Sequence, residues 1–145
     1  ERRYPIVFEK SEFLIDSGGV GKNRGGIGTI SRFKLLGDAL WSCTADKQED
    51  WNGPWGLFGG KSGMTSGILI ERNGKRYTVK ELFNKASNSK FSNIPLKAGD
   101  IMEEWTGGGG GHGNPKNREK TKIENDIKNS LITMKSAKQD YYYED

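Results

Sequence analysis

Cysteine, histidine and proline are scarce in this chain, which has one cysteine, one histidine and four prolines among its 145 residues. The single cysteine, Cys43, excludes an intramolecular disulfide and is typical of a cytoplasmic protein. One cysteine and one histidine cannot assemble a zinc site from the usual nitrogen and sulfur ligands, so no metal site is predicted. The sequence also lacks a transmembrane run and the apolar core of a signal peptide, so neither membrane insertion nor secretion is expected.

Apolar residues are few as well, at 32% of the chain, and the net charge is only +4, with 23 basic and 19 acidic residues well interspersed. A dedicated nucleic-acid binder concentrates its basic residues in a patch or stripe, so nucleic-acid binding is not expected. Four tryptophans, six phenylalanines and five tyrosines argue against a disordered chain. The low apolar fraction suggests that part of the hydrophobic surface pairs with another chain or domain.

Glycine is abundant: 21 residues, which is about twice the average usage of roughly 7%. Such a content usually indicates a β-rich fold with many tight turns and many backbone positions with positive φ. The glycines gather in three segments, at 18–28 (GGVGKNRGGIG), at 50–63 (DWNGPWGLFGGKSG) and at 107–111, where five follow one another.

Between the glycine segments, β-forming residues predict strands at 6–14, 29–36, 39–45 and 101–106. Asn73-Gly74 predicts a two-residue hairpin between strands at 68–72 and 75–79, because this dipeptide supplies both positive φ angles. A helical turn is expected at 81–85 and a polar loop at 87–93. Cys43 lies in an alternating strand pattern, which favours a buried structural thiol over a nucleophile.

After Pro115 glycine disappears, and apolar residues recur at spacings of three and four, which indicates one helical face: Ile123, Ile127, Leu131, Met134, Ala137 and Tyr141. Asn129, Ser130 and Thr133 predict two short helices in place of one long helix. The predicted fold class is therefore mainly β: an antiparallel sandwich or jelly-roll-like domain with glycine-rich loops and a short C-terminal helical segment. We expect a glycine-rich β domain at 1–115, with 116–145 as its helical appendage.

None of the glycine segments satisfies a nucleotide-binding motif. Gly19-Val20-Gly21 is followed by Arg24 where the dinucleotide fingerprint requires glycine. Gly60-Lys61-Ser62 ends like a Walker A motif, but Trp55 stands at the position of its first glycine. The run at 107–111 has no lysine behind it until Lys116. Independent nucleotide binding is therefore not expected.

Several residues of these segments are nevertheless candidates for a substrate or interface loop, although no catalytic residue can be assigned. The Arg24 guanidinium could bind a carboxylate or phosphate in bidentate fashion, or form an ion pair that fixes its own loop. Five successive glycines are costly to order, so they predict a loop that packs against another backbone, a subunit or a substrate. The candidates are Arg24, Gly25, Gly26, Trp55, Phe58, Lys61, Gly108, Gly109, Gly110 and His112.

Simpler roles are expected for most of the side chains in and near these segments. Trp51, Trp55 and Phe58 are expected to cap a sheet or fill an interface in preference to stacking on a ligand. His112 is expected to be a solvent-facing or hydrogen-bonded loop residue. Glu103 and Glu104 are adjacent on a strand, so their carboxylates face opposite sides and do not form an acid/base dyad.

Taken in order, the motifs resemble the hydantoinase B/oxoprolinase family. They are RYP at 3–5, DSGG at 16–19 with GKNRGG at 21–26, PWGLFGG at 54–60, KAGD at 97–100, and TGGGGGHGNP at 106–115, with the closing segment at 137–141. His112 stands where the family usually has an aromatic residue. The resemblance runs from about residue 2 to residue 141 and covers the C-terminal quarter or so of a full family member.

The resemblance implies a cytoplasmic, ATP-dependent, heteromeric enzyme. The chain would be the C-terminal part or a split subunit of a hydantoinase or 5-oxoprolinase-type amidohydrolase that opens a cyclic amide, or of a related ketone carboxylase. Its partners would be a hydantoinase A-like subunit and the remaining N-terminal hydantoinase B-like portion. ATP and a divalent metal are implied for the full complex and none for this chain alone. The alternative is a non-catalytic β scaffold or assembly module of such a complex.

Overall fold

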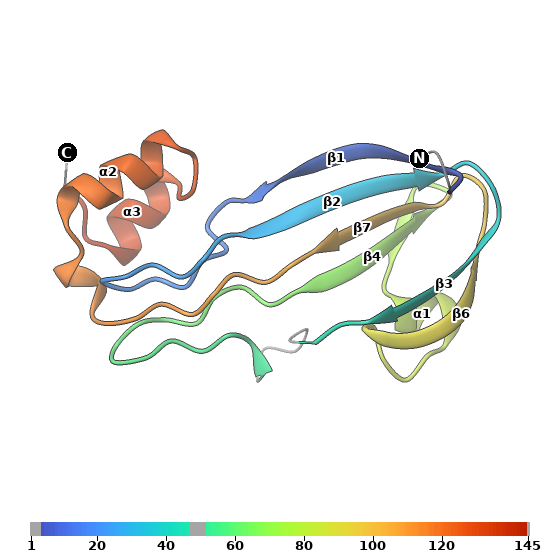
Figure 1. Cartoon of the computed structure of the whole chain (residues 1–145), viewed down its shortest axis with the longest axis horizontal. Helices are drawn as coiled ribbons and strands as arrows, with labels where there is room; N and C mark the ends of the chain where they lie inside the picture. The colour runs from blue at the N-terminus through green and yellow to red at the C-terminus, as the bar shows by residue number, and fades with distance from the viewer. Residues whose placement is uncertain (1–3, 47–51, 145) are drawn as a thin grey trace.

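The computed structural model describes residues 4–46 and 52–144 and is mostly strand (Figure 1). The elements are β1 (Ile6–Leu14), β2 (Gly28–Leu35), β3 (Ala39–Thr44), β4 (Gly67–Arg72), β5 (Lys75–Tyr77), α1 (Val79–Phe83), β6 (Lys90–Leu96), β7 (Ile101–Trp105), the 3-10 helix η2 (Pro115–Asn117), α2 (Lys120–Lys128) and α3 (Met134–Asp140). The sheets lie toward one end and α2 and α3 at the other, with extended loops between them. Among the described residues, no helix is long and apolar enough to cross a membrane.

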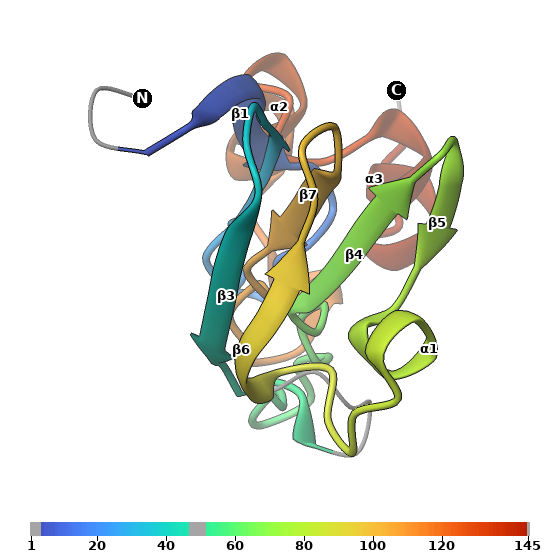
Figure 2. The ribbon, with the colours of Figure 1, turned by 90° about the vertical axis from the view of Figure 1, so that its right-hand side faces the viewer.

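Two antiparallel sheets form the β part of the molecule. The larger has the order β1-β2-β7-β4-β5, and the smaller pairs β3 with β6. Figure 2 shows the small sheet in front of the end of the large one. The prediction of a mainly β, antiparallel fold is confirmed, with the two sheets unequal in size.

The main hydrophobic core lies where the two sheets and α1 meet. Ile70 of β4 and Ile94 of β6 are fully buried, and Met102 of β7 lies beside them in the same cluster. Burial of each such side chain stabilises the fold by roughly 1.5–3 kcal/mol. Helix α1 adds Val79 to this core, and a capping box between Thr78 and Glu81 fixes where the helix begins.

The hairpin at Asn73-Gly74 is confirmed, with φ of 54° and 74° at its two central residues. The polar loop expected at 87–93 is wrong, because Lys90–Leu96 forms strand β6 and pairs with β3. A register shift there and a left-handed φ of 51° at Asn93 mark an irregularity that interrupts the alternating pattern. Pro95 is tolerated because β6 has only one strand neighbour in its sheet.

The two short C-terminal helices are confirmed and form a second core of their own. Ile123, Ala137 and Tyr141 are buried there, as the helical spacing predicts. Met134 is exposed instead, and Ile132 takes its place in the core. The reason is that the chain turns at Ser130 (φ 54°) and α3 starts again behind Thr133, so a single helical phase does not run through both helices.

Candidate functional site

The three glycine segments of the sequence lie side by side as one unit, here called the glycine bundle (17–28, 54–66 and 106–114). Backbone hydrogen bonds tie it together: the N–H of Gly19 donates to Gly109 O at 2.8 Å and the N–H of Gly109 to Gly26 O at 2.9 Å. The middle segment joins through the Lys61 N–H, which donates to Val20 O at 2.6 Å, and the Gly111 N–H, which donates to Lys61 O at 2.9 Å. Segments about ninety residues apart in the sequence are thereby packed backbone against backbone.

Close approach, not positive φ, is what requires glycine in most of this bundle. A Cβ on Gly25 would overlap the carbonyl of Gly109, and a Cβ on Gly110 would overlap the carbonyl of Trp55. Among the described glycines only Gly59, Gly74, Gly99 and Gly113 have positive φ. Backbone positions with positive φ are present as expected, but seven of those in the described residues are not glycine. Most glycines of the bundle are needed because a neighbouring backbone occupies the space of a Cβ.

The same hydrogen bonds decide how well the bundle could bind a phosphate. A phosphate nest needs backbone N–H groups that are free to point at the anion. Here the N–H groups of Gly25, Gly63 and Gly108 donate to backbone carbonyls within the bundle. In addition, the described residues contain no cluster of three or more His, Cys, Asp or Glu that could hold a metal ion. These hydrogen bonds occupy some of the N–H groups that a phosphate nest would need, and the described residues supply no metal ligand cluster.

The candidate side chains Trp55, Phe58, Lys61 and His112 lie on the outside of the bundle. Trp55 is 69% exposed and Phe58 is 81% exposed, so neither caps a sheet within this chain. Trp51 lies outside the described residues. His112 stacks edge-on against Phe58 with ring centroids 5.2 Å apart, and its backbone bridges to Asn23 and Leu57. Leu57 is also exposed, so the outer side of the middle segment presents a run of apolar side chains.

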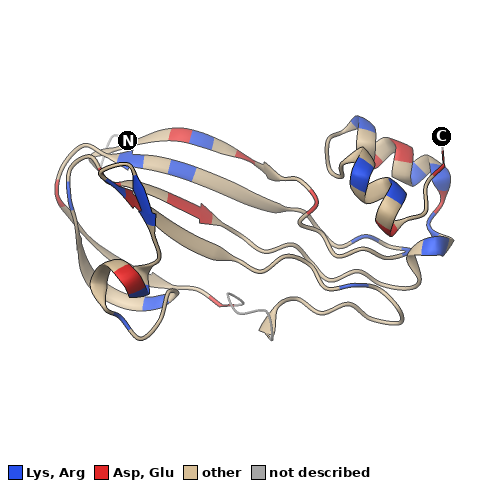
Figure 3. Cartoon of the chain, turned by 180° about the vertical axis from the view of Figure 1, so that it is seen from behind, with Lys and Arg blue, Asp and Glu red and all other residues tan. Residues whose placement is uncertain are grey.

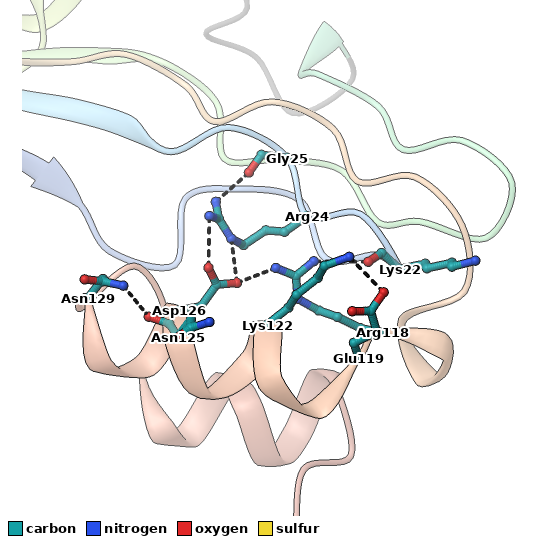
Figure 4. Close-up of polar contacts among 9 residues, drawn as sticks. All are labelled: Lys22, Arg24, Gly25, Arg118, Glu119, Lys122, Asn125, Asp126 and Asn129. Atoms are coloured by element: carbon teal, nitrogen blue, oxygen red, sulfur yellow. Dashed lines mark hydrogen bonds and ion pairs between the residues drawn. The ribbon is translucent and has the colours of Figure 1, made fainter.

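Arg24 points out of the bundle to the helices and is held in a buried ion-pair cluster (Figure 4). Its Nε donates to Asp126 Oδ2 at 3.0 Å, and its Nη2 donates to Asp126 Oδ1 at 3.2 Å. Arg118 Nη2 donates to the same Oδ2 at 2.6 Å. The three side chains are only 8–13% exposed. Of the two roles open to Arg24, the structure shows the ion pair with a carboxylate of its own chain.

Lys61 makes a second, exposed link between the bundle and the helices. Its Nζ donates to Asp140 Oδ1 of α3 at 2.7 Å, and this hydrogen bond raises the pKa of the lysine. Asp16, just before the first glycine segment, accepts from both the backbone N–H and the hydroxyl of Thr133 at 2.8 Å. A further link is Arg118 Nη1, which donates to Lys22 O at 3.1 Å. Several polar contacts thus fasten the C-terminal helical segment to the glycine bundle.

Sequence reasoning found Arg24 but missed Asp126, its partner. A signal was present, because Asp126 follows Ile123 by three residues and therefore lies on the apolar face of α2. A carboxylate on such a face is costly unless it is paired. Figure 3 shows most of the charged residues on the strands and helices and few in the extended loops between them.

Comparisons with known proteins agree with this architecture. The sequence profile of the hydantoinase B/oxoprolinase family matches residues 1–115. An uncharacterized protein from Methanocaldococcus jannaschii is 38% identical over 97% of this chain and 23% of its own length. A protein from Pseudomonas sp. strain NS671, described as the putative B component of a D-/L-hydantoinase, is 30% identical over 97% of the chain and 22% of its own length.

Two solved structures share the fold. The ATP-dependent caprolactamase from Pseudomonas jessenii superimposes with a TM-score of 0.73 at 19% identity, over 97% of this chain and 23% of its own. A nucleotide-free acetone carboxylase superimposes with a TM-score of 0.70 at 20% identity, over 94% of this chain and 21% of its own. The chain thus spans about a fifth to a quarter of the length of each of these four relatives. With the ordered glycine motifs and the profile match, it belongs to the hydantoinase B/oxoprolinase family.

Proposed function

We propose that this chain is the C-terminal, glycine-rich module of a hydantoinase B-type protein in an ATP-dependent enzyme that opens a cyclic amide, acting in the cytoplasm. The observation that carries the proposal is the match of nearly the whole chain to less than a quarter of the Pseudomonas hydantoinase relative. The module contributes a rigid, docked surface, and the remaining B-like portion and a hydantoinase A-like subunit contribute the ATP and metal chemistry.

The outer side of the glycine bundle supports this division of labour. Trp55, Leu57 and Phe58 are exposed apolar side chains on a backbone that the bundle holds rigid, which is the anatomy of a protein interface. The bundle offers no metal ligand cluster among the described residues, and many of its backbone N–H groups are used in hydrogen bonds within the bundle. Both features favour docking over direct chemistry.

Reconstitution of the complex tests the proposal. The chain is co-expressed with a hydantoinase A-like protein and the rest of a B-like protein, and ATP-dependent ring opening of 5-oxoproline, hydantoin and caprolactam is measured. We expect co-purification and amide hydrolysis only when all parts are present. Full activity without this chain would overturn the proposal.

The likeness to acetone carboxylase motivates a second candidate, an ATP-dependent ketone carboxylase. The same reconstituted complex distinguishes it, since incorporation of labelled bicarbonate into acetone without amide hydrolysis would favour the carboxylase.

Phe58→Ala tests whether the module docks through the outer side of the bundle. We expect the association of this chain with its partners to weaken about tenfold, as for the loss of one interface aromatic. Ser62→Ala, at another exposed position of the same segment, is the matched control.

A further inference from the structure

A cavity of about 580 Å³ lies beside the glycine bundle, at the edge of the space between the two sheets. It is lined by Ser31 of β2, Cys43 of β3, Ile68 of β4 and Glu104 of β7, with glycines 107–109 closing one side. Its volume falls within the range of about 300–1,000 Å³ that is typical of small-molecule sites. It is separate from the ion-pair cluster and from the exposed aromatic side chains described above.

The strand register brings the polar wall of this cavity together. Glu104 is paired with Ser31 on one side and with Ile68 on the other, so these three side chains form a row across the sheet. Its neighbour Glu103 points to the opposite face, where it pairs with Arg32 and Arg76. The prediction that the two carboxylates face opposite sides is confirmed, and only Glu104 faces the cavity.

The carboxylate of Glu104 has no hydrogen bond or ion pair with any other residue between 4 and 46 or between 52 and 144, although that of its neighbour Glu103 pairs with Arg32 and Arg76. Partial burial raises the pKa of the Glu104 carboxyl. The second acidic group of the lining is Asp46, which pairs with Lys90 outside the cavity. No lysine or arginine is among the described residues that line the cavity, so its wall attracts cations and repels anions.

We propose that this cavity binds a small organic ammonium ion, with the Glu104 carboxylate as its counter-ion. The hydroxyl of Ser31 lies beside Glu104 in the strand register and offers an acceptor for a second ammonium hydrogen. The apolar part of the ligand lies against Ile68 and the indole of Trp105, which also line the cavity. The inference concerns a site that the proposed docking function does not use.

Cys43 gives a direct readout, because it is the sole cysteine and lines the same cavity. Burial, with the nearby Glu104 charge, raises the pKa of its thiol, so labelling is done at pH 8.5. The labelling rates of a cationic aminoethyl and an anionic sulfonatoethyl methanethiosulfonate are compared by mass spectrometry and normalised to free glutathione. We expect the cationic reagent to be favoured by about fivefold or more, and n-butylammonium to protect Cys43 where n-butanol does not.

Glu104→Gln removes the charge with little change of shape and should bring the reagent preference down to that of glutathione. Glu103→Gln is the matched control on the opposite face and should leave the preference for the cationic reagent unchanged. Equal protection by n-butanol and n-butylammonium in the unmodified chain would overturn the proposal without recourse to any variant. An unchanged preference in folded Glu104→Gln would overturn it as well.

Discussion

At the end of the molecule where β3 and β6 lie, buried side chains fill the space between the two sheets. In the glycine bundle, by contrast, the backbones of neighbouring segments are in direct contact. The first region is stabilised by buried groups such as Ile70, Ile94 and Met102. The second is stabilised by backbone hydrogen bonds, each worth about 0.5–1.5 kcal/mol net, at a high entropic cost of ordering glycine. The two regions are therefore sensitive to opposite kinds of substitution. The sheet core is destabilised by the loss of buried side-chain atoms, and the bundle by a Cβ added where two backbones are in contact.

Gly25→Ala should produce the largest effect, because the new methyl group would overlap the Gly109 carbonyl in the middle of the bundle. We expect a loss of more than about 4 kcal/mol in the free energy of unfolding, or failure to fold, as for severe steric defects. Denaturant unfolding measures it. Gly26→Ala is the matched control, since a Cβ there meets no atom within 4 Å. It should change stability by less than about 1 kcal/mol, and similar losses for both variants would contradict the close-packing argument.

Ile70→Ala tests the other side of the comparison. This side chain is fully buried in the sheet core, and its truncation should cost about 2–5 kcal/mol through lost burial and the cavity left behind. Ile70→Val removes a single methylene group and should cost only about 0.5–1.5 kcal/mol. Chemical denaturation followed by tryptophan fluorescence measures both. A loss for Ile70→Ala as small as that for the valine variant would show that the sheet core is loosely packed.

The two regions also differ in how far the sequence predicts them. The strands and the Asn73-Gly74 hairpin follow from alternation and turn chemistry, which act over a few residues. The glycine motifs mark the family, but their packing against one another depends on contacts about ninety residues apart. A glycine that is needed for a neighbouring backbone looks the same in a sequence as one needed for a turn. For the same reason the sequence does not predict that Arg24 pairs with Asp126, because the two residues are 102 positions apart and no local pattern connects them.

Asp126→Ala should uncouple the helical segment from the bundle. The change leaves two arginines, Arg24 and Arg118, without their shared buried carboxylate. Breaking a buried pair in this way typically costs about 3–5 kcal/mol, and we expect a value near the low end because part of the junction can reach solvent. Hydrogen exchange of the amides in α2 and α3 should accelerate, while that of β2 and β7 should change little.

The control for this junction is Lys61→Ala, which removes the exposed ion pair between Lys61 and Asp140. Exposed pairs contribute about 0–1 kcal/mol, so the helices should remain docked. Equal acceleration of hydrogen exchange in the Lys61 and Asp126 variants would show that the buried cluster is not the principal attachment of the helices to the bundle.

The smallest effect concerns pH and is confined to the sheet end. Asp100 is buried, and burial alone would raise its pKa, but hydrogen bonds from Arg72 at 2.6 Å and from the Lys97 backbone N–H at 2.8 Å outweigh it and lower the pKa below the ordinary 3.8. A carboxyl with a lowered folded-state pKa contributes stability that is present above its unfolded pKa and is lost as the pH falls through the folded value. The sheet end should therefore lose stability below about pH 4.

Asp100→Asn isolates this contribution, because the amide keeps the shape of the carboxyl and cannot ionise. Unfolding by urea at pH 7 and at pH 3 should show a smaller difference between the two pH values for the variant than for the unmodified chain. Hydrogen exchange at pH 3 should place the weakened amides near Arg72 and Lys97, where the carboxylate is held, and not between Gly25 and Gly109, whose contacts are made by backbone groups that do not titrate. Equal weakening in both regions would mean that the stability of the bundle depends on the sheet end, and that the two regions, although held together by different means, unfold as one unit.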